Sequence, residues 1–187
     1  MQRLRGKVMV LILALLGAVI TPVIAAAPAS ARPICDTPYA TYSITGKSFT
    51  YYPTNVYSAW ASFRKGGTIN YSSAKTLSVS ASVTATVSAE AGVIFAKAST
   101  SLGITVGGSY SHSKTWSYTA NVPATTKYKY RLHAYRYAAN FTVTKKVLNQ
   151  SNCRYTIARG YPAKVYHAPP KSSADKYIVW RLDKAKA

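Results

Sequence analysis

The stretch LSVSASVTATVSAEAGVIFAKASTSLGITVGG, Leu77 to Gly108, alternates small polar and apolar residues over most of its length. Successive side chains of a β-strand point to opposite faces of a sheet, so a period of two predicts strands. The apolar positions are odd-numbered as far as Ala89 and, with one threonine as the exception, even-numbered from Ile94 onward. Two strands around a turn would produce this change of parity. The sequence therefore predicts a β-hairpin over 77–106.

This stretch carries almost no charge, although the whole chain is strongly basic. The sequence has 24 Lys and Arg against 4 Asp and Glu, which gives a formal net charge of +20. Lys97 is nevertheless the only lysine or arginine between Thr76 and His112. Burying or translocating a charge costs much free energy, whereas a short hydroxyl side chain is readily exposed or buried with a hydrogen bond. The composition is typical of a segment that changes its surroundings.

The rest of the sequence after residue 31 also favours strands over helices. Tyrosine, threonine and valine are frequent there, and these residue types are enriched in strands. The alternation continues from Tyr110 to Val122, and Pro123 ends it because proline cannot donate to a sheet ladder. We predict an all-β fold, with further strands at 41–51, 127–134, 141–147 and 177–182.

Residues 1–31 have the parts of a secretory signal peptide. Basic residues precede an apolar run, and small residues just before Arg32 offer a cleavage site. The sequence therefore predicts a secreted protein whose mature part, 32–187, is a single β domain. An uncleaved membrane anchor is the alternative, although Pro22 interrupts the apolar run.

The two cysteines of the chain are Cys35 and Cys153. Disulfides form and persist in exported proteins, so we predict that these two cysteines pair. Two free thiols or a bridge between two molecules are the alternatives. With only two cysteines, the chain has neither a CxxC redox motif nor a cysteine zinc cluster.

Without the three basic residues of the signal peptide, the net charge is +17. Such an excess attracts anionic membranes, cell-wall polymers or nucleic acid, and export makes nucleic acid the least expected of the three. Tyrosine and basic residues interleave over 128–137, where the rings could stack on bases or sugars, or could pack inward with the cations outward. The residues predicted to bind an anionic surface are Lys127, Lys129, Arg131 and Arg136.

Catalysis is not predicted from these residues. General acid–base chemistry needs two carboxylates, or a histidine with a partner, in one cleft. This chain has four acids that are far apart in the sequence and three histidines without the short spacing of metal motifs. We therefore expect no enzyme activity, no metal, no cofactor and no small-molecule substrate.

The predicted hairpin could instead cross a membrane. A strand crosses a bilayer in about 9 to 11 residues, and each arm of the hairpin is at least that long. In a transmembrane barrel one face meets lipid and the other meets water, so the alternation must persist for the whole crossing. The lipid-facing positions would be Val79, Val83, Val87, Leu102, Ile104 and Val106. The apolar tip that enters first would be Gly92, Val93, Ile94 and Phe95.

The alternating Ser/Thr-rich hairpin, its apolar tip and the second long strand ending at Val122-Pro123 resemble the aerolysin and epsilon-toxin superfamily. Residues 75–147 carry this resemblance, and small secreted actinobacterial proteins with an alanine-rich leader look similar. The resemblance implies an elongated antiparallel β-module with long twisted strands. It also implies that the hairpin inserts after the protein forms a homo-oligomer on membranes. Members usually have a separate receptor-binding domain, for which this chain leaves little room.

Two functions follow as expectations. The first is a secreted cationic pore-forming or membrane-perturbing protein. The second is a secreted binding or surface-structural protein of aerolysin-like fold, which binds anionic cell-surface polymers without forming pores. A soluble β-sandwich whose polar strand faces simply meet water is a further alternative, although it rarely needs arms this long.

Overall fold

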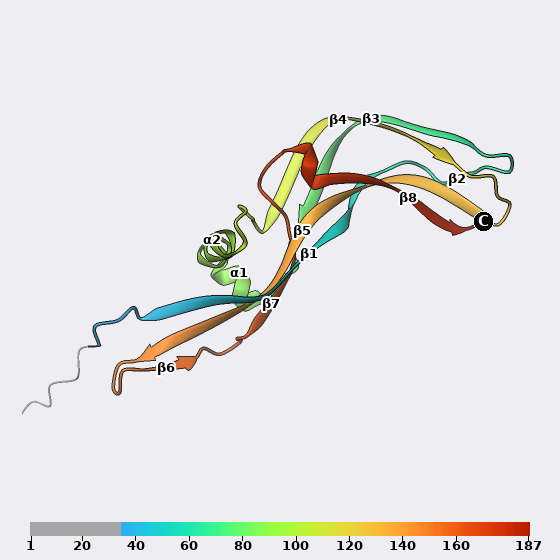
Figure 1. The fold of residues 1–187 in the computed structure, drawn as a ribbon. Coiled ribbons are helices and arrows are strands. Elements are labelled where there is room, and N and C mark those ends of the chain that lie inside the picture. Colours follow the sequence, from blue (N-terminus) through green and yellow to red (C-terminus); the bar gives the residue numbers. More distant parts are fainter. Residues whose placement is uncertain (1–34) are drawn as a thin grey trace, which may run out of the picture. The chain divides into compact units, whose positions relative to one another are not determined.

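The structure is a computed structural model that describes residues 35–187, and these residues belong to one unit of the chain, Pro33–Ala187. The predicted signal peptide lies outside the described residues. Antiparallel strands make up most of the fold, which confirms the all-β prediction (Figure 1). The strands are β1 (Ala40–Tyr57), β2 (Ala61–Ser62), β3 (Gly67–Ser80), β4 (Ser109–Val122), β5 (Tyr128–Asn149), β6 (Arg154–Ile157), β7 (Ala163–Ala168) and β8 (Ile178–Lys186). The helices are α1 (Ala85–Ala89), α2 (Ala91–Leu102) and the 3-10 turn η1 (Asp175–Tyr177).

Strand β5 is the centre of a six-stranded sheet, because the other five strands all pair with it. Strands β1 and β2 lie along one edge of β5, and β8, β7 and β6 follow one another along the other edge. Two of the predicted strands, 127–134 and 141–147, are therefore parts of this one long strand. Apart from His133 and Leu148, the buried positions of β5 change from even to odd numbers at Ala138–Ala139, close to the register shifts in the pairing with β1 and β7.

Strands β3 and β4 form a separate two-stranded ribbon. They pair without a shift from Gly67–Val122 to Ser80–Ser109. Every even-numbered residue of β3 and every odd-numbered residue of β4 is exposed. This outer face consists of serine, threonine and asparagine, with Ala74 as the one other residue. The inner face packs on β5 and β8.

The predicted hairpin over 77–106 is wrong as a description of this fold. Residues Leu77–Ser80 end strand β3, but β3 pairs with β4, and most of the chain between these strands is helical. The alternating pattern led to a wrong prediction because small residues such as alanine and serine fit both a strand and a helix. Tertiary packing then decides between them, as it often does when local preferences are weak.

Two hydrophobic cores hold the described residues together. One lies between the helices and strands β5 and β7, and includes Val87, Ile94, Phe95, Ala98, Phe141 and Val165. The other lies between the β3–β4 ribbon and strands β5 and β8, and includes Leu77, Val79, Trp116, Val122 and Leu132. The predicted Cys35–Cys153 disulfide is confirmed.

Candidate membrane-insertion segment

The chain between β3 and β4, residues 81–108, is here called the connecting segment. Backbone bridges hold it at both ends. Near its start, the Ser82 N–H donates to the Tyr166 carbonyl at 2.8 Å, and the Tyr166 N–H donates back at 3.0 Å. Near its end, the Gly107 N–H donates to the Pro169 carbonyl at 3.0 Å. Figure 1 shows both helices of this segment at one end of the β3–β4 ribbon.

Local signals explain why the segment forms helices. The Thr84 hydroxyl accepts a hydrogen bond from the Val87 N–H, as an N-cap does, and so α1 begins at Ala85. Helix α2 ends at Leu102, and the residue after it, Gly103, has φ +70°, a left-handed conformation that glycine tolerates best. Within α2, the hydroxyls of Ser99 and Thr100 donate to carbonyls one turn earlier.

Helix α2 docks through one narrow apolar face. Ile94, Phe95 and Ala98 are buried, and the Phe95 ring meets the Phe141 ring of β5 edge to face at 6.4 Å. The spacing i, i+1, i+4 is that of a helix face. Ile94 and Ala98 also fit the even-numbered apolar positions of the strand pattern, whereas Phe95 does not. The opposite side of α2 is exposed, and Lys97 lies there.

The only acid of the connecting segment, Glu90, ties the start of α2 to the sheet. Its carboxylate accepts hydrogen bonds from Tyr42 at 3.1 Å and Tyr161 at 2.7 Å, and it forms an ion pair with Lys145. We call these four residues the Glu90 cluster. The bonds from Lys145 and Tyr161 lower the pKa of Glu90, although burial opposes the shift. The carboxylate in turn raises the pKa of Lys145.

Loss of the Glu90 charge should loosen α2. A lowered pKa means that the native state favours the ionised carboxylate, so this stabilisation is complete above the unfolded pKa of about 4.3 and is lost as pH falls through the folded value. We expect amide protection factors in α2 to fall below pH about 4.3 in the wild type. In Glu90→Gln they should be lower by roughly tenfold at pH 7, since hydrogen bonds to charged groups contribute about 1.5 kcal/mol or more. Hydrogen exchange measures both effects.

The exposed acid Asp36 provides the control for this measurement, because Asp36→Asn changes the net charge by the same amount outside the cluster. Protection of α2 that is equal in Glu90→Gln and in Asp36→Asn would contradict a role for the carboxylate.

The register of the β3–β4 ribbon continues into the connecting segment without a conflict of pattern. If pairing went on beyond Ser80–Ser109, each further pair would also have residue numbers that add to 189. The apolar face would then pair Val83 with Val106, Ala85 with Ile104 and Val87 with Leu102. The polar face would pair Thr84 with Thr105, Ser88 with Ser101 and Glu90 with Ser99, and the turn would fall at Ile94-Phe95. Thr100 is the one polar residue on the apolar face.

The predicted tip residues lie together at the start of α2 but differ in exposure. Gly92 and Val93 are exposed, whereas Ile94 and Phe95 are buried. All six predicted lipid-facing residues lie in or against the two cores. Val79, Val87 and Val106 are buried, and Val83, Leu102 and Ile104 are half-buried.

The four cations predicted to bind an anionic surface do not form one site. Arg136 is fully buried, so it is not available to a polymer outside; its guanidinium packs on the Tyr110 ring and donates to the carbonyls of Pro170 and Ser172. Arg131 pairs with Asp183 and lies over the rings of Tyr57 and Trp60. The alternating pattern could not separate a buried arginine from an exposed lysine.

The other two predicted cations, Lys127 and Lys129, belong to a larger group that sequence reasoning missed. Strands β5 and β8 pair Lys129 with Ala185, and the turn before β3 contacts the chain before β5 through the Thr125 N–H and the Phe63 carbonyl. Cations from three parts of the sequence therefore meet at the end of the ribbon far from the helices. We call this group the basic end: Arg64, Lys65, Lys127, Lys129, Lys184 and Lys186.

No protein-family model matches the chain, and no curated protein sequence is significantly similar to it. Among residues 35–187, none of the helices has the length and apolar character needed to cross a membrane.

Proposed function

We propose that this is a secreted cationic protein that perturbs membranes or forms pores, and that the connecting segment is the part that inserts. The observation that carries the proposal is the continuous register: the ladder of β3 and β4 can extend through residues 81–108 while apolar and polar side chains stay on separate faces. A helix does not require apolar residues at every second position. The presence of this period therefore supports a second, extended conformation of the connecting segment.

The extended form has dimensions that suit a bilayer. Residues 81–93 and 96–108 would add 13 residues to each arm of the ribbon, and about 9 to 11 residues cross the hydrocarbon core. If the connecting segment left the sheet, the core between the helices and strands β5 and β7 would be exposed to water. Burial of the apolar side chains of the segment in lipid would offset that cost. As the resemblance to aerolysin implies, several copies would have to join, because an isolated hairpin leaves unpaired strand edges in lipid.

Exposed lysines lie around the connecting segment and could bring it to an anionic membrane. The Lys47 ammonium donates to the Ser101 carbonyl at 3.0 Å, Lys97 lies on α2, and the Lys171 side chain reaches Gly107. The basic end serves this purpose less well. The ribbon of 14 residues in each strand separates it from Ser80 by roughly 45 Å, at about 3.3 Å per residue.

The basic end supports a second candidate function, attachment to an anionic cell-surface polymer without insertion. Its six cations are far from the connecting segment, and the nearest acid, Asp183, already accepts from Arg131, His133 and Tyr135. A cluster of this kind attracts an extended polyanion, and salt weakens the attraction.

Dye release from liposomes separates the two functions. The mature protein should release dye from vesicles that contain anionic lipid, and replacing Lys127, Lys129, Lys184 and Lys186 by Gln should leave that release within about twofold while it weakens polyanion binding. Protein that binds vesicles yet releases no dye, at any pH or lipid composition, would refute insertion and favour the second function.

A further inference from the structure

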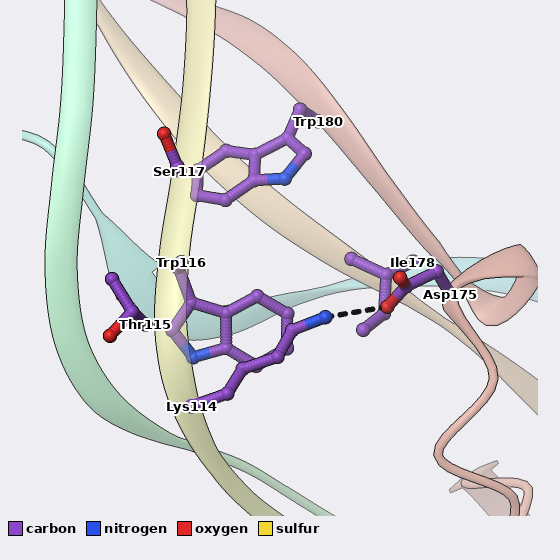
Figure 2. Close-up of a pocket in the computed structure, with 7 residues that line it drawn as sticks. All are labelled: Lys114, Thr115, Trp116, Ser117, Asp175, Ile178 and Trp180. Atoms are coloured by element: carbon purple, nitrogen blue, oxygen red, sulfur yellow. Dashed lines mark hydrogen bonds and ion pairs between the residues drawn. The ribbon is translucent and has the colours of Figure 1, made fainter.

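A groove lies between strands β4 and β8, apart from the connecting segment, and Figure 2 shows the side chains around it. Its volume is about 340 Å³. The residues that line it supply two indole rings, an ion pair and one aliphatic side chain, and two further β4 residues line it although their hydroxyls point away, to the outer face: Trp116, Trp180, Lys114, Asp175, Ile178, Thr115 and Ser117. Aromatic walls with a few polar groups are typical of a small-ligand site.

The ion pair in this groove is in contact with an aromatic ring. The Lys114 Nζ lies 2.6 Å from an Asp175 carboxylate oxygen and 4.5 Å from the centre of the Trp116 ring. A cation therefore already occupies the position between a carboxylate and an indole face, as Figure 2 shows. The Asp175 side chain is 79 % exposed, and exposed pairs of this kind are weak. A ligand can thus exchange with this pair at little cost.

The arrangement of the rings argues against a sugar. A pyranose stacks on an open aromatic face. Trp116 is buried with Lys114 over its ring, and Trp180 is stacked on Tyr118 with ring centres 5.3 Å apart and planes within 6°. Tyr71 approaches Trp180 as well, at 5.4 Å. The groove offers a position for a cation rather than a flat platform.

We propose that the groove binds a phosphocholine group, a quaternary ammonium joined to a phosphate. The ammonium takes the place of the Lys114 Nζ between Asp175 and Trp116, and its methyl groups contact the indoles and Ile178. The displaced Lys114 side chain then pairs with the phosphate, so one internal ion pair is exchanged for two with the ligand. A quaternary ammonium is more weakly hydrated than the lysine ammonium that it replaces, and aromatic groups recognise such cations.

This inference goes beyond the proposed function and does not depend on it, because the groove could bind the headgroup of a choline lipid or free phosphocholine whether or not the connecting segment inserts. Titration of the mature protein with soluble phosphocholine, followed by tryptophan fluorescence or calorimetry, tests the site directly. We expect saturable binding, at least tenfold weaker binding of phosphoethanolamine, and no saturable binding of inorganic phosphate at the same concentrations.

Three variants assign the binding to the groove. Asp175→Asn should weaken phosphocholine binding at least tenfold, whereas Asp36→Asn, which removes an exposed acid elsewhere, should not change it. Lys114→Gln vacates the cation position and removes the partner of the phosphate. It should therefore bind choline more tightly than the wild type does, while the preference for phosphocholine over choline falls at least tenfold.

Vesicles then distinguish the source of the group. Phosphatidylcholine vesicles that sediment with the wild type but not with Asp175→Asn indicate a lipid headgroup. Binding of soluble phosphocholine without any difference between the two proteins on vesicles indicates the free compound. No saturable binding of phosphocholine by the wild type, or binding that Asp175→Asn leaves unchanged, would overturn the proposal.

Discussion

A disulfide that joins Ser82→Cys to Tyr166→Cys should abolish dye release from liposomes. The two residues already exchange two backbone hydrogen bonds, and such antiparallel pairs have Cα atoms about 5.5 Å apart, within the range of a disulfide. Both side chains are exposed, so the two substitutions remove no buried side chain from the folded protein. In the extended hairpin residue 82 pairs with residue 107 instead, which the bridge forbids. We expect release by the oxidised variant to fall by roughly 100-fold, because the inserting state can no longer be populated.

Reduction provides the internal control for this experiment. Dithiothreitol should restore release to the stapled variant, but it can also reduce the native Cys35–Cys153 bridge. The wild type is therefore measured with and without reductant, and the single variant Ser82→Cys is measured beside it. Full dye release by the oxidised double variant, with the engineered disulfide verified by mass spectrometry, would show that dye release does not require the connecting segment to leave the sheet.

A charge at the exposed part of the tip should also prevent release while the fold survives. Val93 is 49 % exposed on α2, so Val93→Asp buries no charge in the folded protein. In the extended hairpin the same position lies next to the turn and must enter the hydrocarbon core. Placing a carboxylate there costs on the order of 3 kcal/mol, and dye release should fall by roughly 100-fold. Vesicle sedimentation should still detect surface binding.

Ile157→Asp is the matched control, since Ile157 is 56 % exposed on β6, outside the connecting segment. It introduces the same charge and should leave release within about twofold. Ile94→Asp and Phe95→Asp are less informative, because both side chains are buried and a charge would undock α2 before any membrane is met. Release by Val93→Asp equal to that of Ile157→Asp would show that the tip does not enter lipid.

Strand positions were predictable where the pattern and the chain breakers agreed. Strand β4 ends at Val122 because Pro123 follows it, and its alternating residues divide into a packed face and an exposed face as expected. The Cys35–Cys153 bridge was predictable from the number of cysteines and the predicted signal peptide alone. In both cases a single local signal determined the structure, and no other signal in the sequence favoured a different one.

The connecting segment was not predictable in the same way, because two local rules competed there. Ile94, Phe95 and Ala98 satisfy a strand period only in part, and they form a helix face as well. Which structure forms depends on Phe141 and Val165, which lie far away in the sequence and cover that face. The period of two therefore indicates a local preference for an extended strand, and the packing of α2 on the sheet overrides that preference.

The groove had no sequence signal at all. Lys114 and Asp175 are 61 residues apart, and the alternation in β4 does not indicate that they meet. The buried Arg136 is the opposite case, a residue that was noticed for its charge but whose role depends on the ring of Tyr110. The Lys114–Asp175 pair and the surroundings of Arg136 both depend on β4 and on the chain after β7. The spacing of residues within one strand does not indicate such contacts.

The unshifted pairing of β3 with β4 up to Ser80–Ser109 has a consequence for the speed of any refolding. The two ends of the connecting segment are already side by side, so an extended hairpin needs no new nucleus and grows by adding pairs to an existing ladder. Hairpins form within about 1 to 10 μs even without that advantage. The slow step of insertion should therefore be the release of α2 from its core, and substitutions beneath that helix should change the rate more than substitutions along the arms.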